Sequence, residues 1–425
     1  MFDTFHHSEQ LMALEKQAME KLSSQLQVID QRAEQNQWRV LNSFRHQQIS
    51  DAHLQGTTGY GYDDFGREAL EAVYAEVFGA EAGLVRPQLI SGTHAITVAL
   101  FGVLRPGDEL LYITGKPYDT LESVIGLRAG GHGSLKDFNI DCGIVALDKG
   151  TINVEEVCRR ITPKVKMVAI QRSRGYGDRP SLSIRSIQSA ITRIKAQHPD
   201  IIVFVDNCYG EFVETLEPCH VGADLMAGSL IKNPGAGLAR VGGYIVGNQD
   251  LVAHCAERLT APGLGKEVGP TLGMLPEMYQ GLFLAPHVTA EALKGALFTA
   301  ASMEAVGMMA QPLWHEERTD LVQSVTFHDP ERMVAFCQAI QQCSPINAHV
   351  KPVPSPMPGY DDPVIMAAGT FVQGASIELS ADGPLREPYT VFVQGGLTFA
   401  HVKYAILFAI DTLMEKGMLP VGQAQ

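Results

Sequence analysis

Lys232 lies among small residues, in the segment GSLIKNPGAG at positions 228–237. The small side chains leave room for a bulky group beside the amine. A lysine that forms a Schiff base needs a lowered pKa, from burial or from a cationic neighbour, so that part of it is neutral. The hydroxyl of Ser229, three residues earlier, could bond a phosphate. For this segment alone, an ordinary exposed loop lysine is the simpler interpretation.

A carboxylate, Asp206, ends the apolar run IIVFV at 201–205. A carboxylate at the carboxyl end of a buried parallel strand lies where open α/β sheets bind their ligands. An aspartate in this place is also a common helix cap, so the position alone does not decide between the two interpretations.

Two upstream segments predict an anion site and an aromatic contact. Ser91-Gly92-Thr93 opens an expected helix over 93–104, where hydroxyls and first-turn N–H groups meet the positive end of the helix dipole. This is the donor set of a phosphate cradle, although N-capping by Ser91 or Thr93 also accounts for it. Tyr118 follows an expected strand at 109–113, so its ring could stack on a flat ligand; a surface tyrosine in a turn is the alternative.

The elements that position these groups alternate along the chain. The pattern predicts helices over 67–78, 93–104 and 184–197, and strands over 83–89 (strand or turn), 109–113, 165–171 and 201–205. Apolar strands without alternation predict a mostly parallel sheet that is covered by helices on both faces. We therefore expect an α/β protein with an N-terminal helical arm (1–55), a large domain (56–285) and a smaller C-terminal α/β domain (286–425).

In order and spacing, these segments resemble the fold-type I pyridoxal-phosphate (PLP) enzymes, and within them the cystathionine/methionine gamma-lyase group. The likeness is greatest to the methionine gamma-lyase-related, or aluminium resistance, branch, and it covers about residues 50–415. It implies the fold-type I PLP-dependent transferase fold, with PLP carried by Lys232 as a Schiff base. It implies that Lys232 is also a general acid and base, and that Asp206 pairs with the pyridinium nitrogen. It also implies cofactor contacts from Ser91, Gly92, Thr93, Ser229 and the ring of Tyr118. Tyr118 is in addition the implied catalytic partner of Lys232.

A segment of the family that reaches into the neighbouring subunit's phosphate site is altered here. The family has a Tyr-x-Arg pattern, whereas this chain has Tyr60-Gly61-Tyr62 without the arginine two residues after the tyrosine. We expect Tyr60 and Tyr62 to contact the cofactor, with Arg67 as the replacement for the missing arginine. The alternative for Arg67 is a charge at the start of a helix.

Three further arginines are substrate candidates. Arg386 in the small domain is the candidate for the substrate α-carboxylate, because its planar fork matches a carboxylate; the alternative is a turn arginine paired with Glu387. Arg172 and Arg174 replace the usual Ser-Pro-x-Asn-Pro of the family. One of them could face the phenolic oxygen of the cofactor or the substrate, and Arg174 is the candidate for substrate binding.

The bulk composition restricts the partners. The chain has 425 residues, 45% of them hydrophobic, and a formal net charge of −14, which disfavours nucleic acid and acidic membranes as partners. The N-terminus lacks a basic start followed by an apolar run, and no apolar stretch has the length of a membrane span. Seven cysteines without a CxxC or a Cys/His cluster predict reduced thiols and no metal site. We expect a cytoplasmic protein.

The leading hypothesis is a PLP-dependent carbon–sulfur lyase that acts on a sulfur-containing or similarly substituted amino acid. Through an external aldimine, Lys232 would remove the α-proton and a β- or γ-substituent would leave, giving a keto acid and ammonia. Alternatives are another PLP amino-acid enzyme (an aldolase, desulfurase or transaminase type) or a PLP-binding stress or regulatory protein with little catalysis. No GxGxxG between a strand and a helix supports a dinucleotide-dependent dehydrogenase. The resemblance also implies a homodimer or homotetramer with shared active sites.

Overall fold

The computed structural model describes residues 5–128, 132–357 and 360–419. The chain forms two compact units, a large unit (Gln35–Ala285) and a small unit (Met1–Glu34 with Pro286–Gln425). The domain bounds expected from the sequence, 1–55, 56–285 and 286–425, stay a prediction. The arm expected over 1–55 is one long helix, α1 (Ser8–His46), followed by the short helix η2 (Asp51–Leu54), and its residues are divided between the two units.

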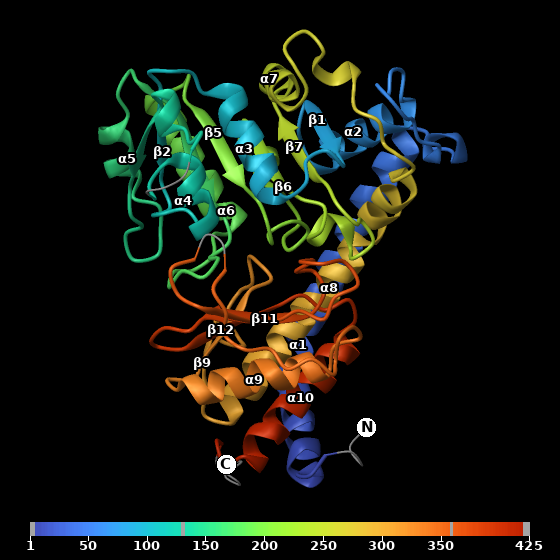
Figure 1. The fold of residues 1–425 in the computed structure, drawn as a ribbon, viewed down its shortest axis with the longest axis vertical. Helices are drawn as coiled ribbons and strands as arrows, with labels where there is room; N and C mark the ends of the chain where they lie inside the picture. The colour runs from blue at the N-terminus through green and yellow to red at the C-terminus, as the bar shows by residue number, and fades with distance from the viewer. Residues whose placement is uncertain (1–4, 129–131, 358–359, 420–425) are drawn as a thin grey trace. The chain divides into compact units, whose positions relative to one another are not determined.

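The large unit is built on a seven-stranded sheet with the order β3-β2-β4-β5-β6-β7-β1 (Figure 1). Only β7 runs against the others, since it pairs antiparallel with both β6 and β1. The expected mostly parallel sheet is therefore confirmed. The strands are β1 (Ala82–Arg86), β2 (Glu109–Tyr112), β3 (Asp141–Ile144), β4 (Val165–Gln171), β5 (Ile202–Asp206), β6 (Leu225–Ser229) and β7 (Gly243–Gly247).

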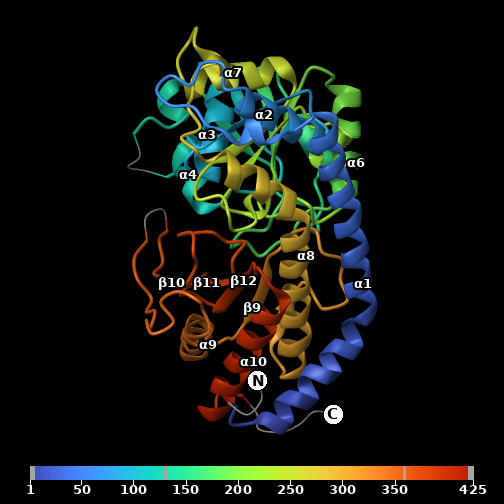
Figure 2. The same ribbon diagram turned by 90° about the vertical axis from the view of Figure 1, so that its right-hand side faces the viewer.

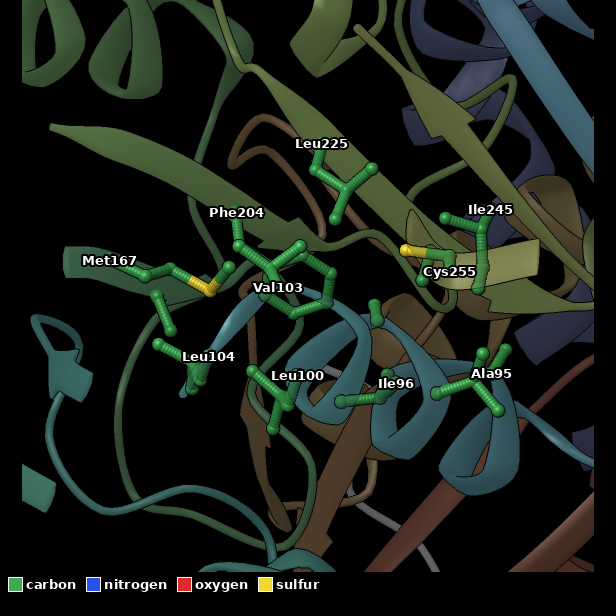
Figure 3. Packing of buried hydrophobic residues seen from close by; sticks show 14 of the residues in the cluster. Ala95, Ile96, Leu100, Val103, Leu104, Met167, Phe204, Leu225, Ile245 and Cys255 are labelled. Carbon is green, nitrogen blue, oxygen red and sulfur yellow. The ribbon is translucent and has the colours of Figure 1, made fainter. Parts of the chain in front are cut away.

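Helices cover both faces of this sheet, which explains why its strands are apolar without alternation. On one face, Phe204 of β5 packs in a cluster with Leu100 of α3 and Cys255 of α7 (Figure 3). On the other face, Val203 and Val205 of the same strand pack with residues of α5 and α6. The helices of the large unit are α2 (Phe65–Phe78), α3 (Gly92–Val103), α4 (Asp119–Ile125), α5 (Val154–Arg160), α6 (Ile184–Gln197) and α7 (Gln249–Leu259).

The small unit holds an antiparallel sheet with the order β10-β11-β12-β9-β8, and α9 packs on it with α10 beside α9 (Figure 2). Helix α8 (Leu275–Ala305) has residues in both units. The remaining elements are β8 (Met309–Gln311), β9 (Gln323–Thr326), α9 (Pro330–Gln342), β10 (Val364–Ala367), β11 (Ser380–Pro384), β12 (Thr390–Gln394) and α10 (Phe399–Glu415).

The seven cysteines are all unpaired, as expected. Burial raises the pKa of their thiols, to about 12 for Cys142, Cys255 and Cys343. Among the helices of the described residues, none is long and apolar enough to cross a membrane.

We expect Phe204→Ala to lower the free energy of unfolding by about 3–5 kcal/mol, because the fully buried ring leaves a cavity between β5 and α3. Urea unfolding measures this loss. The control is Phe138→Ala, whose ring is 51% exposed and whose removal should cost about 1 kcal/mol or less. Equal losses for the two variants would contradict the central place of Phe204 in the core.

Candidate active site at the carboxyl edge of the large sheet

Residues from three distant segments meet at one edge of the large sheet. Asp206 ends β5 and Ser229 ends β6, and because these strands are parallel, both residues lie at the same edge. The start of α3 reaches this edge, since a side chain at Gly92 would have its Cβ 3.2 Å from Cys208 Sγ and 3.2 Å from Ser229 Cβ. The structure therefore brings together residues that the sequence could only relate by their order.

The start of α3 combines a cap with unused donors. Ser91 Oγ accepts a hydrogen bond from the N–H of His94 at 3.1 Å, so Ser91 is the N-cap. The first N–H groups of a helix have no acceptor within it, and the dipole is positive there. Ser91 accepts from the N–H of His94 and not from the earlier N–H groups of Gly92 and Thr93. These two N–H groups can therefore donate to an anion.

Tyr118 is tethered at its backbone and at its hydroxyl. Its N–H donates to Gln171 Oε1 at 2.9 Å, and its hydroxyl oxygen lies 2.9 Å from Thr93 Oγ1. Burial, followed by the charge of Asp206, raises the pKa of the phenol, which therefore stays protonated. Gln171 is not among the site residues predicted from the sequence. Its only signal there is its place at the end of the apolar strand β4.

The charges of Asp206 and Lys232 are coupled. Burial raises the pKa of the Asp206 carboxyl, while Lys232 and the N–H of Cys208, which donates to Oδ1 at 3.1 Å, oppose that rise. Burial lowers the pKa of Lys232, but Cys208, Tyr209, Asp206 and Tyr118 together raise it above its ordinary value. These neighbours therefore favour the ammonium form, which is opposite to the lowered pKa that a Schiff-base lysine needs.

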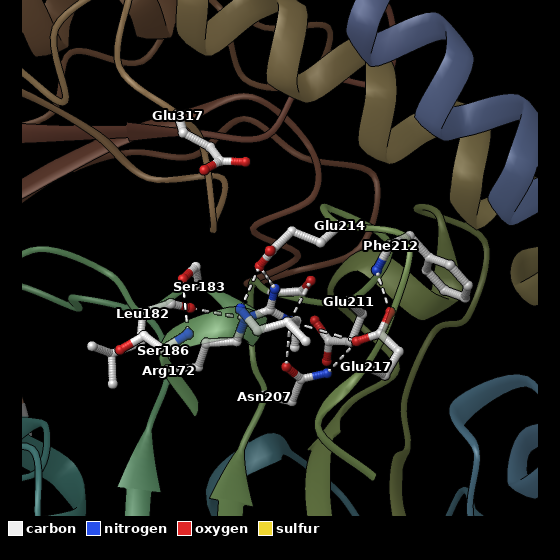
Figure 4. A network of polar contacts seen from close by, with 12 residues as sticks. Arg172, Leu182, Ser183, Ser186, Asn207, Glu211, Phe212, Glu214, Glu217 and Glu317 are labelled. Atoms are coloured by element: carbon white, nitrogen blue, oxygen red, sulfur yellow. Dashed lines mark hydrogen bonds and ion pairs between the residues drawn. The ribbon is translucent and has the colours of Figure 1, made fainter. Parts of the chain in front are cut away.

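Arg172 is bonded to groups of the protein on both sides of its guanidinium (Figure 4). Its side chain is fully buried, and Nη1 donates to Asn207 Oδ1 at 2.8 Å and to the carbonyl of Gly210 at 2.9 Å. Nη2 lies 2.7 Å from Glu214 Oε2, and Nη1 lies 3.5 Å from Glu217 Oε2. Arg172 therefore holds the turn that follows β5.

The other arginines of this segment have separate surroundings. Arg174 is buried, and its Nε and Nη2 both lie 3.2 Å from the carbonyl oxygen of Gly177. Its contact with a substrate stays a prediction. Arg179, which the sequence reasoning missed, donates from Nη2 to the carbonyl of Gln171 at 2.9 Å, and its charge acts on the carboxyl of Asp206. Arg179 is therefore the arginine of this segment whose charge reaches the strand-end carboxylate.

The loop around Tyr60 presents two aromatic rings. Tyr60 and Tyr62 are 65% and 55% exposed, and their rings stack with centroids 5.4 Å apart. Arg67 is fully buried in α2, and Nη1 donates to the carbonyls of Gly61 at 2.7 Å and Gly269 at 2.9 Å. These contacts make Arg67 a support of the loop and do not favour the predicted phosphate contact, which stays a prediction.

Arg386 is an exposed residue of the small unit. Its side chain is 51% exposed, and Nη1 lies 3.3 Å from Asp362 Oδ2. Its contact with a substrate carboxylate stays a prediction. Within residues 5–128, 132–357 and 360–419, no group of three or more His, Cys, Asp or Glu side chains is arranged to hold a metal ion.

Glu211 is a buried acid that the sequence reasoning missed. The hydroxyl of Tyr244 donates to Glu211 Oε1 at 2.8 Å, and in the part of the chain that the structure describes Glu211 Oε2 has no hydrogen-bond partner. Burial raises the pKa of Glu211 to about 8, so the group carries a proton at neutral pH. The sequence gives no signal that Glu211, five residues after the end of β5, is buried.

The arrangement of the large unit is that of the fold-type I PLP-dependent enzymes. Two solved structures show this fold: the PLP-dependent protein YhfS from Escherichia coli, with a TM-score of 0.59 at 18% identity over 89% of this chain and 96% of that chain, and an O-acetylhomoserine (thiol)-lyase homologue from Campylobacter jejuni, with a TM-score of 0.53 at 16% identity over 80% of this chain and 85% of that chain.

The chain belongs to the methionine gamma-lyase family, whose model matches residues 11–414. A solved structure from Listeria monocytogenes, named "putative cystathionine beta-lyase involved in aluminum resistance", is 58% identical, with a TM-score of 0.92 over 94% of this chain and 99% of that chain. A carbon-sulfur lyase involved in aluminum resistance from Clostridium novyi is 48% identical, with a TM-score of 0.91 over 95% and 96% of the two chains. The uncharacterized protein YnbB of Bacillus subtilis is 60% identical over 99% of this chain and 100% of its own length.

We expect Arg172→Met to cost about 3–5 kcal/mol of unfolding free energy, because it removes the cation beside Glu214 and leaves the buried carboxylate of Glu217 with Arg39 as its remaining cation. The matched control is Arg193→Met, which removes an exposed pair with Glu155 and should cost about 1 kcal/mol or less. Urea unfolding at neutral pH measures both. A loss for Arg172→Met no larger than that of the control would show that the network does not hold the turn.

Glu211→Gln should change how stability depends on pH. The folded pKa of Glu211, about 8, lies above its unfolded value, so the protonated acid contributes stability at low pH that is lost as pH rises through 8. Between about pH 5 and 8 the wild type should lose roughly 1.4 kcal/mol per pH unit relative to Glu211→Gln. Parallel stability curves for the two proteins, from urea unfolding across this range, would show that Glu211 is ionised in the fold.

Proposed function

We propose that this chain is a PLP-dependent lyase that breaks a carbon–sulfur bond in an amino acid. The observation that carries the proposal is the convergence of Lys232, Asp206, Tyr118 and the start of α3 at one edge of the large sheet. Each residue alone has an ordinary structural explanation. Their meeting in one place is what a PLP site requires.

The residues present fit PLP as the cofactor. The start of α3 offers N–H donors for its phosphate, and Gly92 lies against Ser229, whose hydroxyl is at the same edge. Asp206 is a buried carboxylate that can accept from a ring nitrogen. The tethered ring of Tyr118 offers a flat face, and Lys232 supplies the amine to which the aldehyde of the cofactor attaches.

The chemistry divides between cofactor and protein. PLP, when bound, supplies an electron-withdrawing ring that stabilises negative charge at the substrate Cα. Asp206, through its negative charge, would favour a proton on the ring nitrogen, and Tyr118 would keep the ring in place. Lys232 Nζ takes the α-proton as a general base, and as an ammonium it can return a proton to the departing or remaining fragment.

Support for a sulfur-containing substrate comes from the relatives. The Clostridium novyi relative is named a carbon-sulfur lyase, and L-methionine gamma-lyase of Pseudomonas deceptionensis is 26% identical over 48% of this chain and 45% of its own length. Elimination of a β- or γ-substituent would release a thiol, ammonia and a keto acid. Arg174 and Arg386 remain our candidates for contacts with the substrate.

We also propose that the protein works in the cytoplasm as a homodimer or homotetramer. The exposed stacked rings of Tyr60 and Tyr62 support this, because exposed aromatic side chains are enriched at subunit interfaces. In this proposal the Tyr60 loop, supported from within by Arg67, contacts the cofactor site of a second subunit.

The test is a spectral and product assay of the purified chain. We expect visible absorbance typical of lysine-bound PLP in the wild type and its loss in Lys232→Ala, because the amine that attaches the cofactor is removed. A panel of sulfur-containing amino acids should then give ammonia and thiol in equal amounts, with at least about a 100-fold lower rate for Lys232→Ala.

Three outcomes would contradict the proposal in different ways. A wild type that takes up no PLP would end it. Glycine and an aldehyde as products would indicate an aldolase, and a binding protein with little catalysis would show absorbance without any substrate-dependent change. Arg193→Met is a suitable control, because Arg193 and its partner Glu155 are both exposed and neither is a residue of the proposed site, so absorbance and rate should be unchanged.

A further inference from the structure

Tyr209 has a backbone conformation that disfavours its own side chain. Its φ is 70°, in the left-handed region that glycine and asparagine adopt more readily than tyrosine. It lies in the turn that follows β5, where the N–H of Gly210 donates to the carbonyl of Asn207 at 2.9 Å. Such residues persist when the surrounding structure holds them, and they concentrate at functional sites.

The turn is held by the buried side chain of Arg172. Nη1 of Arg172 donates both to Asn207 Oδ1 and to the carbonyl of Gly210, on either side of Tyr209. A side chain at Gly210 would have its Cβ only 2.6 Å from Arg172 Cδ, so the backbone of the turn rests directly on the arginine. The guanidinium therefore fixes the direction in which the ring of Tyr209 leaves the turn.

The ring of Tyr209 meets the amine of Lys232. Lys232 Nζ lies 3.9 Å from the centroid of the ring. An ammonium within about 6 Å of an aromatic face is attracted by the negative charge of that face. The strained turn thus brings an aromatic face to the reactive nitrogen of the proposed enzyme.

We propose that the ring of Tyr209 binds the Lys232 ammonium through a cation–π contact. The ammonium is the form that the side chain takes once it has accepted a proton. The inference rests on the proposed function, in which Lys232 Nζ takes the α-proton of the substrate. By stabilising the ammonium, the ring makes the amine a stronger base and fixes Nζ while it holds the proton. Tyr209 acts through Lys232 and is therefore a positioning residue.

Other titratable groups also act on Lys232. Asp206 and Cys208 lie on the same turn, Tyr118 lies in the loop before α4, and Glu211 follows the turn. These groups are left unchanged by substitutions at position 209. A variant series at Tyr209 therefore separates the effect of the ring from the effect of the surrounding charges.

The test measures the acidity of Lys232 itself. The full-length chain, freed of any aldehyde with hydroxylamine, is labelled with trace acetic anhydride over an alkaline pH series. Acetic anhydride reacts with neutral amines, and mass spectrometry reads the modified fraction at Lys232, with the exposed Lys164 as an internal reference. We expect the labelling midpoint of Lys232 to fall by about one pH unit in Tyr209→Asn and Tyr209→Gly, and to keep its wild-type value in Tyr209→Phe.

Both ring-less variants suit a left-handed backbone, so the turn should survive, and thermal unfolding checks this. An unchanged midpoint in the two folded variants overturns the proposal. A fall in Tyr209→Phe as large as in Tyr209→Asn also overturns it, because the hydroxyl and not the ring would then carry the effect.

Uptake of PLP is measured by visible absorbance on the same samples. Labelling needs no cofactor, so failed uptake by the wild type counts against the proposed function. An unchanged labelling midpoint, with normal uptake, counts against the role of Tyr209 alone.

Discussion

The hydrogen bonds and ion pairs of the buried Arg172 guanidinium organise the edge of the large sheet at which Asp206 and Ser229 lie. Arg172 follows the end of β4, and its donors reach the turn after β5 and the carboxylates of Glu214 and Glu217. A buried cation costs several kcal/mol unless opposite charges and hydrogen bonds surround it, and here both do. The consequence is a turn with one stable arrangement. Asp206 enters this turn and Tyr209 lies within it, so the two residues that flank the amine of Lys232 both depend on Arg172, whose backbone N–H also donates to the carbonyl of Asp206 at 3.1 Å.

Much of this site could be predicted from the sequence, because its parts are local. A strand-end carboxylate, a lysine among small residues and a Ser-Gly-Thr helix start are short patterns with direct physical meaning. The order of these patterns then indicated the family, and the family model and the fold confirm it. The mostly parallel sheet was also predictable, since β4 and β5 are apolar throughout. Strands β6 and β7 were not predicted, because their glycines weaken the strand pattern that the burial of both faces otherwise produces.

The roles that sequence could not assign are those set by distant neighbours. Arg172 and Arg174 look alike in the sequence, yet one carries a network and the other lies against a nearby carbonyl. The pKa of Lys232 is raised, although a Schiff-base lysine needs a lowered one, because a sequence shows which residue is present but not the charges that surround it. Asp206, Glu211 and Lys232 form a set of interacting groups whose protonation belongs to the set as a whole.

The buried thiols have a chemical consequence for an enzyme of this kind. A thiolate, not a thiol, attacks disulfides and is captured by them, so a raised pKa keeps the reactive fraction very small. Cys208, beside Lys232, is buried and its pKa is raised well above the ordinary value, and burial raises the pKa of the other six cysteines too. In the proposed function a thiol is a product, and the oxidised form of a thiol is a disulfide. The raised pKa values would then withhold the protein's own cysteines from exchange with such disulfides.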